Sequence, residues 1–144
     1  MTTVQTKPKP LTYLPRRTTM TEQESLRKIK IAALKSCDVA LEKLREINNM
    51  MIDQQTCLEE TLSNNLERLL AVKDPQEHIL EMIKITKETQ TKIHEHGWEP
   101  IRFMNIKIQF VEDQKKNIRK AKTEHEVILL VEVIAAGLRK EQVA

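Results

Sequence analysis

The sequence predicts an all-α protein: an elongated antiparallel helical bundle or coiled coil, preceded by a disordered N-terminal arm. Three observations support this fold class. Glycine occurs only twice in 144 residues, and most of the five prolines lie in the arm or at an expected helix start. Aromatic residues make up 3% of the chain, which is too few to fill a deep core. Apolar residues recur at helical spacing over long segments.

Residues 1–20 are predicted to form a flexible basic arm, because they are rich in Thr, Pro and Lys and show no apolar periodicity. This arm has four basic residues and no acidic one, whereas the rest of the chain is almost neutral; the four are Lys7, Lys9, Arg16 and Arg17. Four charges can attract an anionic surface, but the run is too short to predict nucleic-acid binding.

Residues 21–144 are predicted to form a single helical domain. Thr21 to Glu24 and Thr123 to Glu126 both have the capping-box pattern that begins a helix. Gly97 suits a helix end and Pro100 suits a helix start, with Trp98-Glu99 as a short joint. The expected helices span about 22–72, 75–96, 100–121 and 124–140.

One segment of the third helix, around Ile106, Ile108 and Phe110, also alternates as a strand would. A helix is favoured there because the flanking residues 112–122 are charged and no hairpin partner exists. The last helix is apolar on several faces. It is therefore either the most buried segment or the carrier of an exposed binding surface.

A heptad-like seam runs through the first helix. Its apolar members, expected to serve self-association or adsorption to an apolar surface, are Leu34, Leu41, Leu44, Met51, Leu58, Leu62 and Leu69, with Cys37 in the same stripe. Its polar members are Asn48, Gln55 and Asn65. Buried amides in a seam can fix register and oligomer number. The alternative is that these three face solvent where the helix rotates away, and the sequence leaves both open.

The second helix is expected to start at Asp74-Pro75-Gln76-Glu77. In this interpretation Asp74 is the N-cap, Pro75 occupies the first helical position, and Glu77 completes a capping box. The methionines at 50, 51, 82 and 104 are interpreted as ordinary core or seam residues, with an adaptable apolar surface as the alternative.

Several function classes are disfavoured by the residues present. The four histidines lack the convergent Cys or His neighbours of a zinc site and are expected on the surface. Paired carboxylates such as Glu59-Glu60 lie among surface charges, and no glycine-rich phosphate loop is present. We therefore expect no enzymatic activity, cofactor or metal. Cys37 and Cys57 would lie about 30 Å apart on one helix, too far to pair, and are expected to be small buried residues.

No secretory signal or membrane span is expected. The most apolar run, 127–136, is interrupted by Glu132 and is shorter than the roughly 20 residues that a membrane span needs. A cytoplasmic location follows as the expectation.

Residues about 26–95 resemble a phasin segment. The resemblance rests on Ala40-Leu41-Glu42, Ile47-Asn48, Gln54-Gln55, Leu58-Glu59-Glu60, and Leu69-Leu70 leading into Lys73-Asp74-Pro75-Gln76-Glu77. It implies a non-enzymatic amphipathic helical protein that coats polyhydroxyalkanoate storage granules in the cytoplasm and self-associates into homo-oligomers. The alternative is a coiled-coil scaffold or adaptor that binds a protein partner without polymer. A third interpretation is membrane-surface binding through the basic arm and an amphipathic helix.

Overall fold

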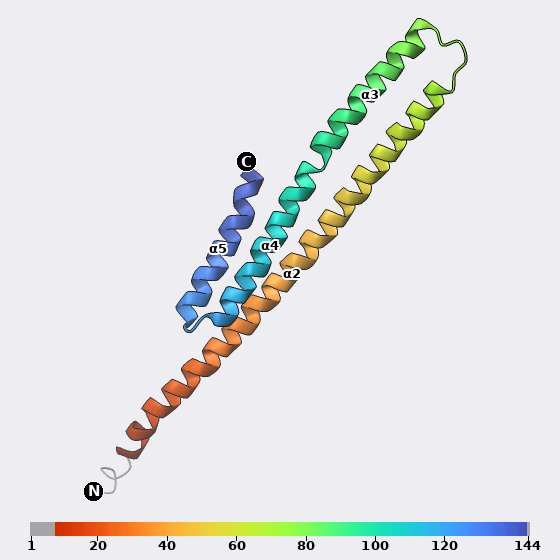
Figure 1. Ribbon diagram of the computed structural model, residues 1–144. Coiled ribbons are helices and arrows are strands. Elements are labelled where there is room, and N and C mark those ends of the chain that lie inside the picture. Colours follow the sequence, from red (N-terminus) through yellow and green to blue (C-terminus); the bar gives the residue numbers. More distant parts are fainter. Residues whose placement is uncertain (1–7, 144) are drawn as a thin grey trace. The chain divides into compact units, whose positions relative to one another are not determined.

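The computed structural model describes the backbone of residues 8–143 and the side chains of residues 21–139. Four helices account for nearly all of this range: α2 (Pro8–Leu70), α3 (Glu77–Gly97), α4 (Glu99–Lys120) and α5 (Glu124–Val143) (Figure 1). The described residues contain no strand. The all-α prediction is confirmed, and the segment around Ile108 is helical.

The first helix begins earlier than expected, at Pro8 rather than near residue 22. Residues 1–7 of the predicted arm lie outside the described residues, as do the side chains of residues 8–20. The flexibility and basic surface of the arm therefore stay predictions.

The contacts of the chain divide it into two compact units. The expectation that residues 21–144 form a single domain stays a prediction. The first unit joins residues 8–40 of α2 to residues 110–143, and the second spans residues 41–109. Packing in a helical hairpin is local, because each segment contacts only the segment that faces it. The long α2 consequently supplies one strip of each unit.

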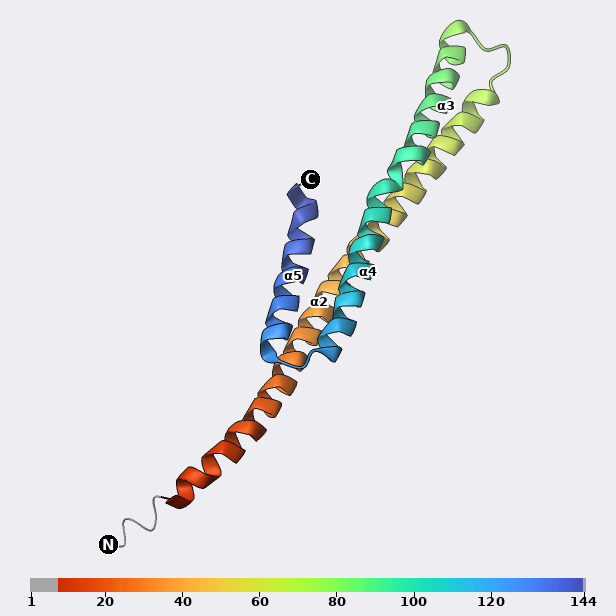
Figure 2. The same cartoon turned by 60° about the vertical axis from the view of Figure 1, so that its left-hand side comes forward.

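The first unit packs three helical segments. Its core is apolar and draws on each of them: Ala33 and Cys37 from α2, Val111 and Ile118 from α4, Ala121, and Val127 and Ile134 from α5. Figures 1 and 2 show α5 running back beside the C-terminal part of α4. Two contacts tie α2 to α4: Lys115 Nζ lies 2.5 Å from Asp38 Oδ1, and Lys30 Nζ donates to the Arg119 carbonyl at 3.0 Å.

The second unit is a thin helical hairpin. The C-terminal part of α2 lies antiparallel to α3 and the start of α4, and both views of the ribbon agree on this (Figures 1 and 2). The buried residues are few: the apolar Leu41 and Ile101, and the amides Asn48 and Gln55. None of the 21 residues of α3 is buried. This unit therefore has a polar, sparsely filled interior.

The loop between α2 and α3 corrects the predicted helix start. Asp74 has φ 50°, a left-handed conformation that Asp tolerates but an N-cap residue does not adopt. The N-cap is instead Gln76, with φ −76° and ψ 168°, and it makes no side-chain capping bond. Pro75 precedes the cap, and Glu77 is the first helical residue rather than the third. The predicted capping box does not form here.

The last helix begins as predicted. The Glu126 N–H donates to Thr123 Oγ1 at 3.2 Å, which is the N-cap half of a capping box. The Glu126 carboxylate accepts from the Lys122 N–H at 3.1 Å, one residue earlier than the standard motif.

Candidate interaction surfaces

The predicted seam lies mostly inside the fold. Leu41 and Cys37 are buried, and five other apolar members are half-buried: Leu34, Leu44, Met51, Leu62 and Leu69. Leu58 differs, because 44% of it is exposed. These side chains pack against the chain's own helices. A role in adsorption or self-association would require the hairpin to open.

The three polar seam residues separate into two kinds. Asn48 is buried and its Nδ2 donates to Asn105 Oδ1 at 2.9 Å; its own Oδ1 has no partner among the described residues. Gln55 is buried and its Nε2 donates to the Ile93 carbonyl at 3.0 Å. Both amides thus join α2 to the helices that return along it. Asn65 is exposed and faces solvent in this chain, so its predicted register role stays a prediction.

The joint between α3 and α4 is held by residues that the seam pattern did not single out. Trp98 is the only residue between the two helices. The carboxylate of Glu59, on α2, contacts the side chains of His94 and Trp98. Glu59 Oε1 lies 2.6 Å from His94 Nδ1, and Glu59 Oε2 accepts from Trp98 Nε1 at 3.3 Å. One α2 carboxylate therefore holds both the end of α3 and the joint residue Trp98.

Gly97 matters here for a reason other than the predicted helix ending. It has no positive φ, so it is not a left-handed cap. A Cβ at this position would lie 2.5 Å from Gln55 Cδ and closer still to the amide atoms. Glycine leaves room for the buried Gln55 amide. In the sequence, the only indication that Gly97 is needed for packing is that it lies directly before the Trp98-Glu99-Pro100 joint.

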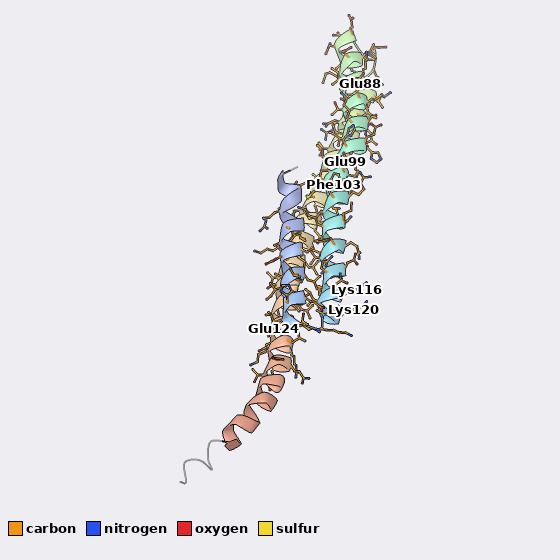
Figure 3. All side chains as sticks on the ribbon, turned by 90° about the vertical axis from the view of Figure 1, so that its left-hand side faces the viewer. Glu88, Glu99, Phe103, Lys116, Lys120 and Glu124 are labelled. Atoms are coloured by element: carbon orange, nitrogen blue, oxygen red, sulfur yellow. The ribbon has the colours of Figure 1, made fainter. Side chains whose placement is uncertain are left out.

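The hairpin carries many exposed apolar side chains, which are spread over more than one side of its helices. On α3, Leu80 is 54% exposed, Met82 47% and Ile85 52%. The neighbouring segments of the same unit add Ile47, Met50, Leu58, Leu70, Val72, Phe103 and Ile106. We refer to Leu80, Met82 and Ile85 as the outer α3 set. Figure 3 labels Phe103 on α4.

The last helix has both of the properties that the sequence left open. Val127 and Ile134 are buried, whereas Ile128, Leu129, Val131 and Val133 are 40–48% exposed. A shallow groove continues this surface onto the end of α4, and it is lined by Asn117, Lys120, Ala121, Glu126, Leu129, Leu130 and Val133. Figure 3 labels Lys120 and, at the start of α5, Glu124.

The titratable residues form no metal-binding cluster among the described side chains. No group of three or more His, Cys, Asp or Glu residues is placed to hold a metal ion in that part of the chain. The four histidines are exposed, as predicted. Cys37 is buried as predicted, but Cys57 is exposed, because it lies off the stripe that faces α3. Burial raises the pKa of the Cys37 thiol, Lys115 lowers it, and Asp38 raises it further.

Comparison with known proteins found no matching family model, no matching curated protein and no matching solved structure. No helix within the described residues is long and apolar enough to cross a membrane.

Proposed function

We propose that this chain is a non-enzymatic, phasin-like protein that coats polyhydroxyalkanoate granules in the cytoplasm through amphipathic helices. The observation that carries the proposal is the outer α3 set: this helix buries none of its residues and leaves three large apolar side chains about half exposed. The resemblance over residues 26–95 includes all of α3 up to residue 95 and overlaps this hairpin over residues 41–95.

The exposed apolar side chains of the hairpin support adsorption to a polymer. Removing apolar area from water contributes about 25 cal/mol per Å², and the outer side chains are available without opening the fold. Each side chain of the outer α3 set is about half exposed, so covering it contributes roughly 1 kcal/mol, half of the usual value for a full burial. Met82 and Ile85 are three residues apart and lie on one side of α3, so one surface can cover both, and together they contribute about 2 kcal/mol.

The test uses polyhydroxybutyrate beads, polystyrene beads and anionic vesicles, with the bound fraction measured across salt concentrations. We expect selective binding to polyester that salt does not weaken. The variant Met82→Gln/Ile85→Gln should bind polyester about 30-fold more weakly, since about 2 kcal/mol is lost and 1.4 kcal/mol corresponds to a factor of ten. Lys84→Gln/Glu88→Gln, which changes exposed charges of the same helix, is the matched control and should bind normally.

The proposal fails if the unaltered protein does not bind polyester beads. It also fails if the α3 glutamine variant binds them normally while its circular dichroism shows intact helices. Vesicle binding that salt abolishes would instead favour membrane-surface attachment through the basic arm. Substituting Leu41 would be a poor test, because this residue is 1% exposed and its loss would disturb the fold.

The second candidate function is a coiled-coil scaffold that binds a protein partner. The amides Asn48 and Gln55 do not decide it, because both are paired within the hairpin. The observation that favours it is the apolar surface of the last helix, where Ile128, Leu129, Val131 and Val133 are 40–48% exposed. A protein that binds no bead yet forms a defined oligomer would favour this candidate.

A further inference from the structure

An open groove runs along the line where α2 meets the end of α4, within the first compact unit. Both ribbon views show these two segments side by side (Figures 1 and 2). The groove has a volume of about 380 Å³, which is near the small end of the range for ligand sites. It therefore has room for one slender molecule. We call it the α2–α4 groove.

The floor of the α2–α4 groove is apolar and belongs to α2. Leu26 and Leu34 are half-buried and Ile31 is 45% exposed, so all three still have area that a ligand can remove from water. Leu26 and Leu34 are eight residues apart, which corresponds to about 12 Å along a helix axis. A methylene chain of medium length lying on this floor would be favoured by the loss of apolar area from water on both sides.

Three cations border this floor. Arg27 and Lys30 come from α2, and Arg119 comes from α4. Lys30 Nζ donates to the Arg119 carbonyl at 3.0 Å, which holds its ammonium group at the groove. No carboxylate of the described residues forms an ion pair with the guanidinium of Arg27 or Arg119. The groove thus offers positive charge that the described part of the fold does not neutralise.

The combination of an apolar floor and unpaired guanidinium groups indicates the chemistry of the occupant. Guanidinium groups bind carboxylates through two parallel N–H···O bonds, and the long side chains of Arg27, Lys30 and Arg119 can converge on one anionic group. The small volume suits one hydrocarbon tail rather than the two of a phospholipid. A single-chain carboxylate therefore matches both the charge and the size of the groove.

We propose that the α2–α4 groove binds a free fatty acid of medium chain length. Its carboxylate is held by Arg27, Lys30 and Arg119, and its chain lies against the apolar floor. This site is separate from the outer α3 set, which belongs to the second unit, and it does not rest on the proposed granule-coating function.

Isothermal titration calorimetry of the full chain tests the ligand class, with decanoate as the probe at concentrations below those at which it forms micelles. Decanoate should bind saturably at one site per chain. Decanol keeps the tail without the charge, and acetate keeps the charge without the tail, so each should bind at least about tenfold more weakly. The proposal is overturned if decanol or acetate binds as tightly as decanoate, or if anionic phospholipid vesicles bind whereas monomeric decanoate does not.

Charge variants test where the carboxylate lies. Arg27→Gln/Arg119→Gln should weaken decanoate binding about tenfold, the scale expected for two exposed charge contacts. The Lys30 bond is kept in this variant, because it is the backbone carbonyl of Arg119 that accepts it. Lys28→Gln/Lys120→Gln is the matched control: it removes one exposed cation from each of the same helices, neither of which lines the groove. It should bind decanoate normally. Equal weakening by both pairs would show general attraction to positive charge and would refute the site.

Floor variants test where the chain lies. Ile31→Gln should weaken decanoate binding about fivefold, because the tail loses part of its apolar contact. Val39→Gln is the matched control, since Val39 is 55% exposed on the same helix but does not line the groove. Circular dichroism should show intact helices in every variant. If Ile31→Gln binds decanoate as well as Val39→Gln does, the tail does not lie in this groove and the proposal is wrong.

Discussion

Replacing Gly97 with alanine should destabilise the protein even though alanine is the better helix former. The added methyl group would occupy the space of the Gln55 amide, whose Cδ lies 2.5 Å from the position of that methyl. The Gln55 side chain is flexible enough to move aside, so the main cost is its hydrogen bond to the Ile93 carbonyl. Losing that bond with the amide still partly buried costs about 1–2 kcal/mol.

The opposing term is the helix propensity of alanine, which is up to about 1 kcal/mol more favourable than that of glycine. The net change for Gly97→Ala is therefore a loss of about 1 kcal/mol in the free energy of unfolding. In a Gln55→Ala background neither the collision nor the hydrogen bond exists, so only the propensity term remains. There Gly97→Ala should stabilise the protein by up to about 1 kcal/mol.

The assay is urea unfolding of the four proteins of this double-mutant cycle. Trp98, the only tryptophan, is half-buried next to Gly97 and reports directly on this joint by fluorescence. A change of sign between the two backgrounds, with a coupling of about 2 kcal/mol, is the expected result. Equal effects of Gly97→Ala in both backgrounds would refute the view that glycine is required by the Gln55 amide.

Three further outcomes are expected. Gly137→Ala should destabilise the protein by up to about 2 kcal/mol, because overpacking costs about 1–3 kcal/mol and the helix propensity of alanine offsets up to about 1 kcal/mol. The new Cβ would lie 2.7 Å from Phe110 Cε2, so Phe110→Leu should relieve the penalty in thermal unfolding; an unchanged penalty would refute this. Asn48→Leu should raise the urea midpoint by removing a buried Oδ1 that lacks a partner, whereas a lower midpoint would show that the amide stabilises the hairpin. Thiol reagents should label Cys57 in the folded protein and Cys37 only on unfolding. Equal labelling rates for the two thiols in the folded protein would contradict this. The pKa of Cys37 is raised in the folded state, so its contribution to stability is complete below the pKa of the unfolded thiol and is lost as the pH rises through the folded pKa. If the stability of the Cys37→Ala variant falls at alkaline pH as much as that of the unaltered protein, this expectation is wrong.

The positions of helices could be predicted because they depend on local signals. The Thr123 cap, the joint at Trp98 and the scarcity of glycine all act within a few residues, and the structure places helix boundaries near them. The exception is Asp74, where the residues of a capping box are present but the chain reversal requires a left-handed residue. A capping pattern depends on residue types alone and does not predict the backbone conformation that the reversal between α2 and α3 imposes on Asp74.

The surfaces were harder to predict because burial depends on the partner of each helix. A strict heptad stripe drifts by about 20° per heptad around a straight helix. The seam therefore faces the returning helices at Leu41 and Gln55 but rotates outward at Leu58 and Asn65. The contacts of Glu59 with His94 and Trp98 join residues 35 and 39 positions apart, and no spacing rule within one helix could identify them.

The hairpin connectivity also constrains the order in which the chain can fold. Contacts near the exposed loop 71–76 join residues that are close in sequence, and the separation grows with distance from that loop: 38 positions for Gln55 and Ile93, 57 for Asn48 and Asn105, and 77 for Asp38 and Lys115. Because the entropic cost of closing a chain segment rises with its length, each contact formed nearer the loop lowers the cost of the next. Contacts of the sparsely packed hairpin should therefore form first, beginning near the loop, and those of the well-packed three-helix unit should form last. During synthesis, most of α2 must leave the ribosome long before the residues that will cover it.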